Sequence, residues 1–165
     1  GCLLSVNKHQ FQLRGGCSYR EVGISVVRTL PPARRPTVEP LTPQARELLA
    51  GPNFAVVATT NADGSLQQTV VWAKERDGEI VFSSLKSRAK TRNLQRDPNV
   101  SVLIIDRENG YRYSSIRGQA RVEDAGANEL IDELSHDYDG RPWPEEQPWK
   151  PRSTIVVTPS RIIEH

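Results

Sequence analysis

Basic side chains are crowded into one short stretch of the sequence, SRAKTRNLQRD at positions 87–97, with one more lysine just before it. The only acid in the stretch is its last residue. If the segment is helical, residues four apart are neighbours, and each pair of like charges costs about 0.2 to 0.5 kcal/mol. The three such pairs are Lys86 with Lys90, Arg88 with Arg92, and Arg92 with Arg96.

An external anion would offset this repulsion. Cations in the first turn also oppose the positive end of the helix dipole, and no neighbouring acid compensates them. A phosphate or carboxylate can accept charge-assisted hydrogen bonds from Arg88, from Lys90 and from the free backbone N–H groups near Ser87. The segment therefore predicts an anion-binding site. A solvated helix face, which is what most charge runs form, is the alternative interpretation.

The composition favours a small anionic ligand over nucleic acid. The chain has 165 residues, of which 36% are hydrophobic and 25% charged, and this suits one globular domain. Its formal charge is only +2, so a preference for anions must come from where the cations lie. The aromatic side chains that stack on bases are missing around the basic segment, and we expect no nucleic-acid partner.

Neither a metal site nor a membrane segment is expected. Cys2 and Cys17 form no CxxC pair, and the three histidines are scattered without an HExxH motif. No apolar run approaches the roughly 18 to 20 residues of a membrane span. No charged-then-apolar leader opens the chain, so we expect a cytoplasmic protein with no membrane partner.

The basic segment must be positioned by a domain, which we expect to span residues 41–165. Residues 1–40 lack a sustained period and end in LPPARRPTVEP, so they are predicted to be an N-terminal extension or linker. The run VGISVV at 22–27 could add one strand. Regular structure begins with a helix at LTPQARELLAG, capped by Thr42 with Pro43 in its first turn and ended by Gly51 in a left-handed conformation.

Runs rich in β-forming residues follow this helix. The turns NADG and RDGE join the first three runs into an antiparallel meander, because hairpin-length links cannot join parallel strands. The basic segment comes next as a short helix, capped by Ser87 and ended by Asp97 and Pro98. Gly118 predicts a bulge or a tight bend, and Pro159 predicts a break in the last strand. The predicted strands are 53–60, 65–75, 80–84, 99–106, 111–123 and 153–165, with a further helix at 124–138.

Six strands with turn-sized links and helices at the margins predict a mainly β domain. We expect the strands to close into a small antiparallel barrel, because closure removes exposed sheet edges. The sequence has no GxGxxG motif, so a Rossmann dinucleotide site is not expected.

The string SRAKTRNLQRDPNVSVLI, preceded by FSS and by TTNADGSLQQTVVW, carries a resemblance. It closely resembles the split-barrel flavin and deazaflavin oxidoreductases of the pyridoxamine 5'-phosphate oxidase-like (PPOX-like) superfamily, and more narrowly their actinobacterial F420-dependent branch. The likeness runs from about residue 53 to residue 122 and continues more weakly to the end. It implies a six-stranded antiparallel split β-barrel of the FMN-binding type with flanking short helices.

The resemblance also implies a homodimer, with each cofactor site built at the interface from both chains. It assigns the cofactor's phosphate and acidic tail to Arg88, Lys90 and Asn93, with Arg92 nearby. It places Ser83 and Ser84 at the edge of the tail or ring. Along the ring face it places Thr69, Val70, Val71 and Trp72. It names no catalytic residue.

Some of these positions have a second interpretation. The polar residues from Gln67 to Thr69 would also suit a satisfied edge strand. Trp72 stands where the family pattern has a polar residue, and it would also suit a core or dimer contact. The segment YDGRPWPEEQPWKP at 138–151 would either cover a substrate pocket or pack against the barrel.

The resemblance implies an F420-dependent oxidoreductase that transfers a hydride between reduced deazaflavin and a small unsaturated organic substrate. The organic cofactor supplies the chemistry, so no catalytic triad is required. FMN ends in one phosphate, whereas F420 carries a phosphodiester and several glutamates, so four or five clustered cations favour F420. The alternatives are an FMN-dependent oxidoreductase of the same fold and a flavin- or deazaflavin-binding protein without turnover.

Overall fold

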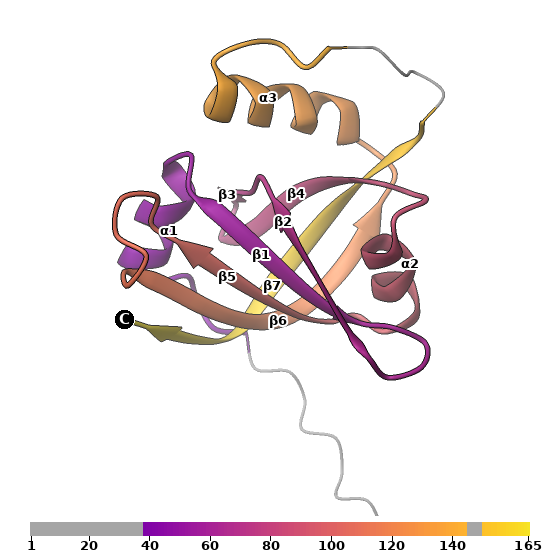
Figure 1. Cartoon of the computed structure of the whole chain (residues 1–165), viewed down its shortest axis with the longest axis horizontal. Coiled ribbons are helices and arrows are strands. Elements are labelled where there is room, and N and C mark those ends of the chain that lie inside the picture. The colour runs from indigo at the N-terminus through magenta and orange to yellow at the C-terminus, as the bar shows by residue number, and fades with distance from the viewer. Residues whose placement is uncertain (1–37, 145–149) are drawn as a thin grey trace, which may run out of the picture. The chain divides into compact units, whose positions relative to one another are not determined.

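Seven antiparallel strands and three helices make up the part of the chain that the computed structural model describes, residues 38–144 and 150–165 (Figure 1). The strands form one sheet in the order β2-β1-β5-β6-β7-β4-β3. The elements are α1 (Pro43–Ala50), β1 (Phe54–Thr60), β2 (Leu66–Val71), β3 (Lys74–Arg76), β4 (Glu79–Leu85), α2 (Ala89–Arg96), β5 (Asn99–Ile105), β6 (Tyr113–Glu123), α3 (Ala127–Asp139) and β7 (Arg152–Glu164).

The two edge strands of this sheet, β2 and β3, are consecutive in the chain and are linked only by Trp72 and Ala73. The chain itself therefore bridges the seam at which the sheet would close, which is the arrangement of a split barrel. The sequence predicted one strand here, at 65–75, and six strands in all. The structure has seven because the pairing partner changes within this run: β2 pairs with β1, whereas β3 pairs with β4. The mainly β, antiparallel split-barrel prediction is confirmed.

Alternating burial along the strands builds the core. In β1 every second residue from Ala55 is buried, and β5 follows the same pattern from Val100. The inward side chains pack with those of β4, β6 and β7, including Phe82, Ile116 and Ile155, all of which are fully buried. The outward side chains of β1 and β5 remain half-buried or exposed, and several of them are apolar.

The ends of the first two helices differ in part from the predictions. Thr42 caps α1 by accepting from the backbone N–H of Ala45 at 3.1 Å, as expected. Gly51 is not left-handed but extended, at φ −98°, because the Asn53 side chain donates to the Leu48 carbonyl at 2.8 Å and satisfies the helix end instead. The N-cap of α2 is Arg88, not Ser87, and no side chain caps it; α2 ends at Asp97 as predicted.

The long strands β6 and β7 carry the pairing that holds the barrel together. The register shifts between Arg117 and Gly118, so the predicted bulge is confirmed. A Cβ atom on Gly118 would lie only 2.4 Å from the Thr158 carbonyl oxygen, which leaves room for glycine alone. Because this bulge absorbs the irregularity, β7 continues through Pro159, where a break was predicted. The predicted strand at 22–27 lies outside the described residues.

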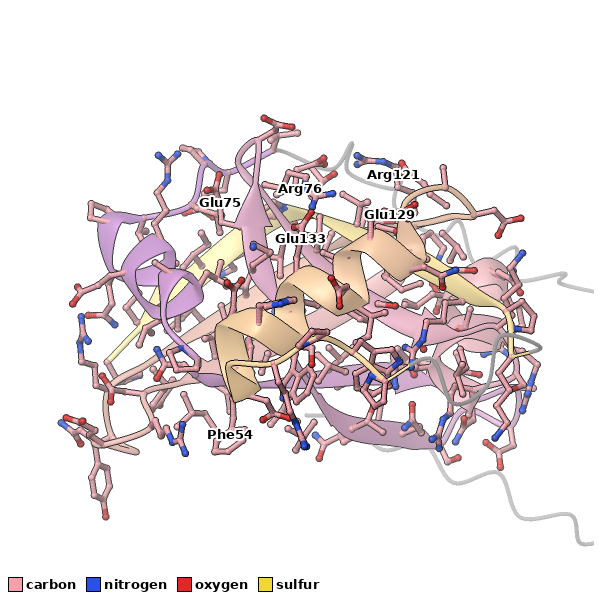
Figure 2. All side chains as sticks on the ribbon, turned by 90° about the horizontal axis from the view of Figure 1, so that it is seen from above. Phe54, Glu75, Arg76, Arg121, Glu129 and Glu133 are labelled. Atoms are coloured by element: carbon pink, nitrogen blue, oxygen red, sulfur yellow. The ribbon has the colours of Figure 1, made fainter. Side chains whose placement is uncertain are left out.

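Helix α3 begins at Ala127, three residues later than predicted, and packs against β4 and β7. Three ion pairs tie it to β3. Lys74 Nζ lies 2.7 Å from Asp137 Oδ2 and 3.6 Å from Glu133 Oε2. Arg76 lies 2.8 Å from Glu133 Oε2, and both of these residues are labelled in Figure 2. Its apolar residues Leu130 and Leu134 are fully buried against the sheet. In the described ranges, no helix combines the length and the apolar character needed to cross a bilayer.

Candidate functional site

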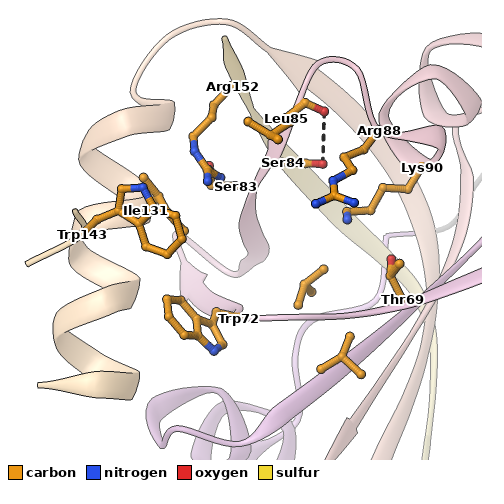
Figure 3. A pocket seen from close by; sticks show the side chains of 12 residues that line it. Thr69, Trp72, Ser83, Ser84, Leu85, Arg88, Lys90, Ile131, Trp143 and Arg152 are labelled. Atoms are coloured by element: carbon orange, nitrogen blue, oxygen red, sulfur yellow. Dashed lines mark hydrogen bonds between the residues drawn. The ribbon is translucent and has the colours of Figure 1, made fainter. Parts of the chain in front are cut away.

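A cavity of about 350 Å³ opens between the start of α2, the strands β2, β4 and β7, and helix α3 (Figure 3). Its volume falls in the range of small-molecule sites. We call it the cationic cavity. It is lined by Thr69, Val70, Val71, Trp72, Ser83, Ser84, Leu85, Arg88, Lys90, Ile131, Trp143 and Arg152.

Three cations line this cavity: Arg88 and Lys90 at the start of α2, and Arg152 at the start of β7. Within residues 38–144 and 150–165, no carboxylate forms an ion pair with any of them. Lys90 is only 8% exposed. Arg152 is half-buried and Arg88 is exposed. A charge buried without a partner is costly, so Lys90 in particular favours an anionic ligand.

The electrostatics of Lys90 and Arg152 reflect this crowding. Burial, followed by the charges of Arg88 and Arg152, lowers the pKa of the Lys90 ammonium. Burial and then the Arg88 charge also lower the pKa of the Arg152 guanidinium. An anion in the cavity would act in the opposite direction, because a nearby negative charge favours the protonated form of each group.

The guanidinium of Arg152 is held in place by the side chains of Ser83 and Trp143. Strand pairing sets it opposite Leu85, and its guanidinium donates to Ser83 Oγ at 3.3 Å. The same guanidinium lies over the indole of Trp143, with its central carbon 4.9 Å from the ring centroid. Ser83 in turn donates to the Ala127 carbonyl at 3.0 Å, at the start of α3. Arg152 thus presents a fixed planar donor to the cavity.

Aromatic side chains form the opposite wall. Trp72 stacks on Tyr138 of α3 at a centroid distance of 5.3 Å and meets Trp143 edge-on at 5.9 Å. The Tyr138 hydroxyl lies 2.7 Å from the Asn53 carbonyl and 3.0 Å from that of Ala73, which fixes the residues around Trp72. In Figure 3, Arg88 and Lys90 approach the cavity from one side, and Trp72, Trp143 and Ile131 lie on the other. The cavity therefore has Arg88 and Lys90 at one end, and at the other the aromatic side chains with Arg152 over Trp143.

Thr69 supplies the one buried side-chain polar atom in the described residues that has no hydrogen-bond partner, its Oγ1. This residue lines the cavity from β2. Buried hydroxyls almost always have a partner, so the atom calls for a polar ligand atom or an ordered water. Together with the unpaired cations, it fits a ligand that has both an anionic group and a polar ring system.

The structure brings eight of the ten predicted site residues to this cavity. The other two, Arg92 and Asn93, do not line it. Arg92 is exposed and donates to the Ser87 carbonyl, which pulls the side chain back along α2. Asn93 is buried and donates to Thr59 Oγ1 at 3.0 Å and to Asn61 Oδ1 at 2.9 Å. It therefore joins α2 to the end of β1.

Sequence reasoning missed four lining residues: Leu85, Ile131, Trp143 and Arg152. Arg152 comes from the last strand and reaches the cavity only through the pairing of β4 with β7. Trp143 belongs to the segment predicted to cover a pocket or pack down, and it lines the cavity; residues 145–149 of that segment lie outside the described residues. The tryptophan-rich composition was the only signal for it.

The cavity lining contains no carboxylate, imidazole or thiol in the described chain. Across the same residues, no group of three or more His, Cys, Asp or Glu side chains is placed to hold a metal ion. The side chains can bind anions and stack on a ring, but they offer few groups for acid–base or nucleophilic catalysis. This arrangement suits a site in which an organic cofactor supplies the reactive atoms.

An antiparallel split barrel with a cavity of this kind defines a class of cofactor-binding proteins, the PPOX-like split barrels. Residues 41–165 match the family model described as pyridoxamine 5'-phosphate oxidase, and the chain belongs to that family. The family binds a flavin or a deazaflavin and has an oxidoreductase fold. The resemblance identified from the basic segment is thereby confirmed at the level of the superfamily.

Solved structures extend the comparison. The chain is similar to an F420 reductase, with 29% identity and a TM-score of 0.64 over 72% of this chain and 94% of that one. It also matches the conserved hypothetical protein Rv2991 from Mycobacterium tuberculosis, with 22% identity and a TM-score of 0.63 over 80% of this chain and 88% of that one. HupZ from Group A Streptococcus matches at 18% identity and a TM-score of 0.58, over 75% and 93%. The last two comparisons concern the fold alone.

Proposed function

We propose that this protein is an F420-dependent oxidoreductase that transfers a hydride between reduced deazaflavin and a small unsaturated organic substrate. The proposal rests on one observation: Arg88, Lys90 and Arg152 line the same cavity. Among the described residues, no carboxylate forms an ion pair with any of the three. The similarity to an F420 reductase at 29% identity supports the same cofactor.

The residues present fit this cofactor. Lys90 and Arg88 would hold the phosphodiester, since both can donate charge-assisted hydrogen bonds at the start of α2. Thr69 and Trp72 would lie along the ring, with the Thr69 hydroxyl directed to a polar ring atom. When bound, the reduced cofactor would supply a hydride to one carbon of the substrate double bond, and solvent or a nearby residue would supply the proton to the neighbouring carbon. Trp72 and Trp143, which are both half-buried and meet edge-on, would limit the access of water to the ring.

FMN is the competing cofactor. It ends in one phosphate, for which Arg88 and Lys90 would suffice, and Arg152 would then remain unpaired. F420 carries further carboxylates beyond its phosphodiester, so three cations in one cavity favour F420. A flavin- or deazaflavin-binding protein without turnover remains the alternative of a different class, because the binding features would be the same.

Titration of the purified protein with F420 and with FMN tests the proposal. We expect micromolar or tighter binding of F420, weaker binding of FMN, and oxidation of bound reduced F420 when a conjugated acceptor is added. Replacing Arg88 and Lys90 together by alanine should weaken F420 binding by about 2 to 4 kcal/mol, through loss of two charged hydrogen bonds. Binding of neither cofactor below about millimolar would reject the oxidoreductase function. Tight binding with no turnover would favour the carrier.

We also propose that two copies of the chain form a homodimer through the outer face of β1, β2 and β5. Strand register places a set of apolar side chains on this one face, which continues onto β7: Phe54, Val56, Val70, Leu103, Ile105 and Ile163. Exposed apolar patches of this kind mark interaction surfaces. Val70 is 61% exposed and also lines the cationic cavity, so a partner on this face would adjoin the cofactor.

A further inference from the structure

Building on the proposed function, we propose that Arg152 is the specificity-determining residue by which the site selects a cofactor with a polyanionic tail over one that ends in a single phosphate. Arg152 stands apart from the basic segment, on β7, and was not part of the anion site predicted from the sequence. We base this role on where Arg152 lies relative to Arg88 and Lys90 and to a second cavity.

A second and larger cavity, of about 1080 Å³, adjoins the cationic cavity beneath the start of α3. Five residues line both: Leu85, Arg88, Ile131, Trp143 and Arg152. Lys90 and Thr69 line only the first. Arg152 therefore stands at the boundary between the two cavities. A ligand whose phosphate lies at Lys90 and whose tail extends further would pass this guanidinium.

The side chain of Arg152 is organised in advance for such a contact. Its hydrogen bond to Ser83 Oγ at 3.3 Å and its position over Trp143 restrict its rotamers. These contacts leave other guanidinium N–H groups available, and no described carboxylate forms an ion pair with it. A planar, restricted guanidinium suits the bidentate binding of a carboxylate, and little side-chain entropy is lost on binding.

The second cavity contributes little net charge of its own. It holds both basic and acidic side chains, and Lys86 is already paired with Asp124 at 2.8 Å. Selection for a tail carboxylate therefore depends on the cations at the boundary. Arg88 is shared with the phosphate in either cofactor, and Lys150 lines only the second cavity, as an exposed side chain. Arg152 is therefore the cation at the boundary that a single-phosphate ligand does not need.

Equilibrium titration of the full chain with three ligands tests this inference: F420, the deazaflavin chromophore without its tail, and FMN. Arg152→Gln should weaken F420 binding about tenfold or more, while the tailless chromophore and FMN change less than about threefold. The tenfold loss should shrink as salt is raised, since an ionic contact is screened. Arg152→Lys, which keeps the charge without the planar fork, should recover part of the affinity.

Arg46→Gln is the matched control. It removes the same charge from an exposed side chain of α1 that lines neither cavity, and it should leave all three affinities unchanged. Unchanged F420 affinity in Arg152→Gln would overturn the inference, as would an equal loss for all three ligands, which would indicate a structural role. If Arg152→Gln does not fold, unchanged F420 affinity in Arg152→Lys overturns it. Failure of the wild-type chain to bind F420 rejects the proposed function itself.

Discussion

Lys90 combines burial with an uncompensated charge. Its pKa is lowered by burial and then by the charges of Arg88 and Arg152, and it is the least exposed of the three cations. In the free protein, the charged form is therefore less favourable in the folded state than in the unfolded state. A site that binds anions in this way loses stability in exchange for affinity.

We predict that Lys90→Gln raises the melting temperature of the cofactor-free protein at neutral pH. The expected rise is about 2 to 4 °C, the shift that ~1 kcal/mol produces in a domain of this size. The folded-state pKa of Lys90 is below its unfolded value, so between the two values the unfolded chain binds more protons and wild-type stability rises with pH. The advantage of the variant should accordingly shrink as the pH approaches 10.5.

Differential scanning calorimetry of wild type and variant at several pH values measures this effect. Lys86→Gln is the control, because Lys86 is partly exposed and paired with Asp124, and its loss should not raise the melting temperature. A lower melting temperature in Lys90→Gln would mean that Lys90 is compensated by a partner. The same variant should bind F420 more weakly.

Tyr138 attaches helix α3 to the barrel near the start of β1 and the link between β2 and β3. Its hydroxyl lies within hydrogen-bond distance of the carbonyls of Asn53 and Ala73 and of the Ala73 N–H, and its ring stacks on Trp72. One side chain thus joins the helix, the start of β1 and the link between β2 and β3. The aromatic wall of the cationic cavity depends on this connection.

Tyr138→Phe should destabilise the domain by about 1 to 3 kcal/mol. It keeps the ring but removes the donor to a part-buried carbonyl, that of Asn53 or Ala73, and the acceptor of the Ala73 N–H. Urea denaturation measures the change. Tyr111→Phe serves as the control, since Tyr111 is 89% exposed and should show no effect. A loss below about 0.5 kcal/mol would indicate that water replaces the hydroxyl. In that case α3 would be held mainly by its ion pairs to β3 and its buried leucines.

The elements could be predicted from sequence where the signals are local. The backbone conformation of a tight turn or a bulge restricts which residues can occupy it, so the turns NADG and RDGE and the bulge at Gly118 are visible in the sequence. In RDGE, for example, Asp77 and Gly78 have φ values of 53° and 81°, as a tight hairpin requires. The division of 65–75 into β2 and β3 was missed because it depends on which strands pair, and that is set far along the chain.

The site follows the same distinction. Arg88 and Lys90 were predicted because they belong to one basic segment, whose self-repulsion is visible in the sequence. Arg152 was missed because only the pairing of β4 with β7 brings it to the cavity. Asn93 was assigned to the cofactor by resemblance, and its amide donates to Thr59 and Asn61 instead of lining the cavity. The side-chain environment of a helix residue is not specified by its motif.

For the whole molecule, the central expectation is the homodimer proposed above. The apolar face of β1, β2 and β5 would be buried between two copies, and Val56 lies near its middle, paired with Val70 on one side and Leu103 on the other. A buried charge there would be costly without a partner. We predict that the wild-type chain has twice the mass of one chain in solution and that Val56→Glu is a folded monomer.

Sedimentation equilibrium gives the mass, and circular dichroism shows whether the variant is folded. Val38→Glu is the control: it makes the same substitution at an exposed valine that belongs to none of the strands β1, β2 and β5, and it should leave the dimer intact. A wild-type monomer at micromolar concentration would reject the dimer. A variant that dimerises as well as wild type would place the interface elsewhere.

A crystal structure of the full chain grown with F420 tests the central claim most directly. We predict that the phosphodiester lies within hydrogen-bond distance of Lys90 Nζ and the Arg88 guanidinium, with the deazaflavin ring against Thr69 and Trp72. Density for F420 at another surface, with Arg88 and Lys90 facing only solvent, would contradict the claim.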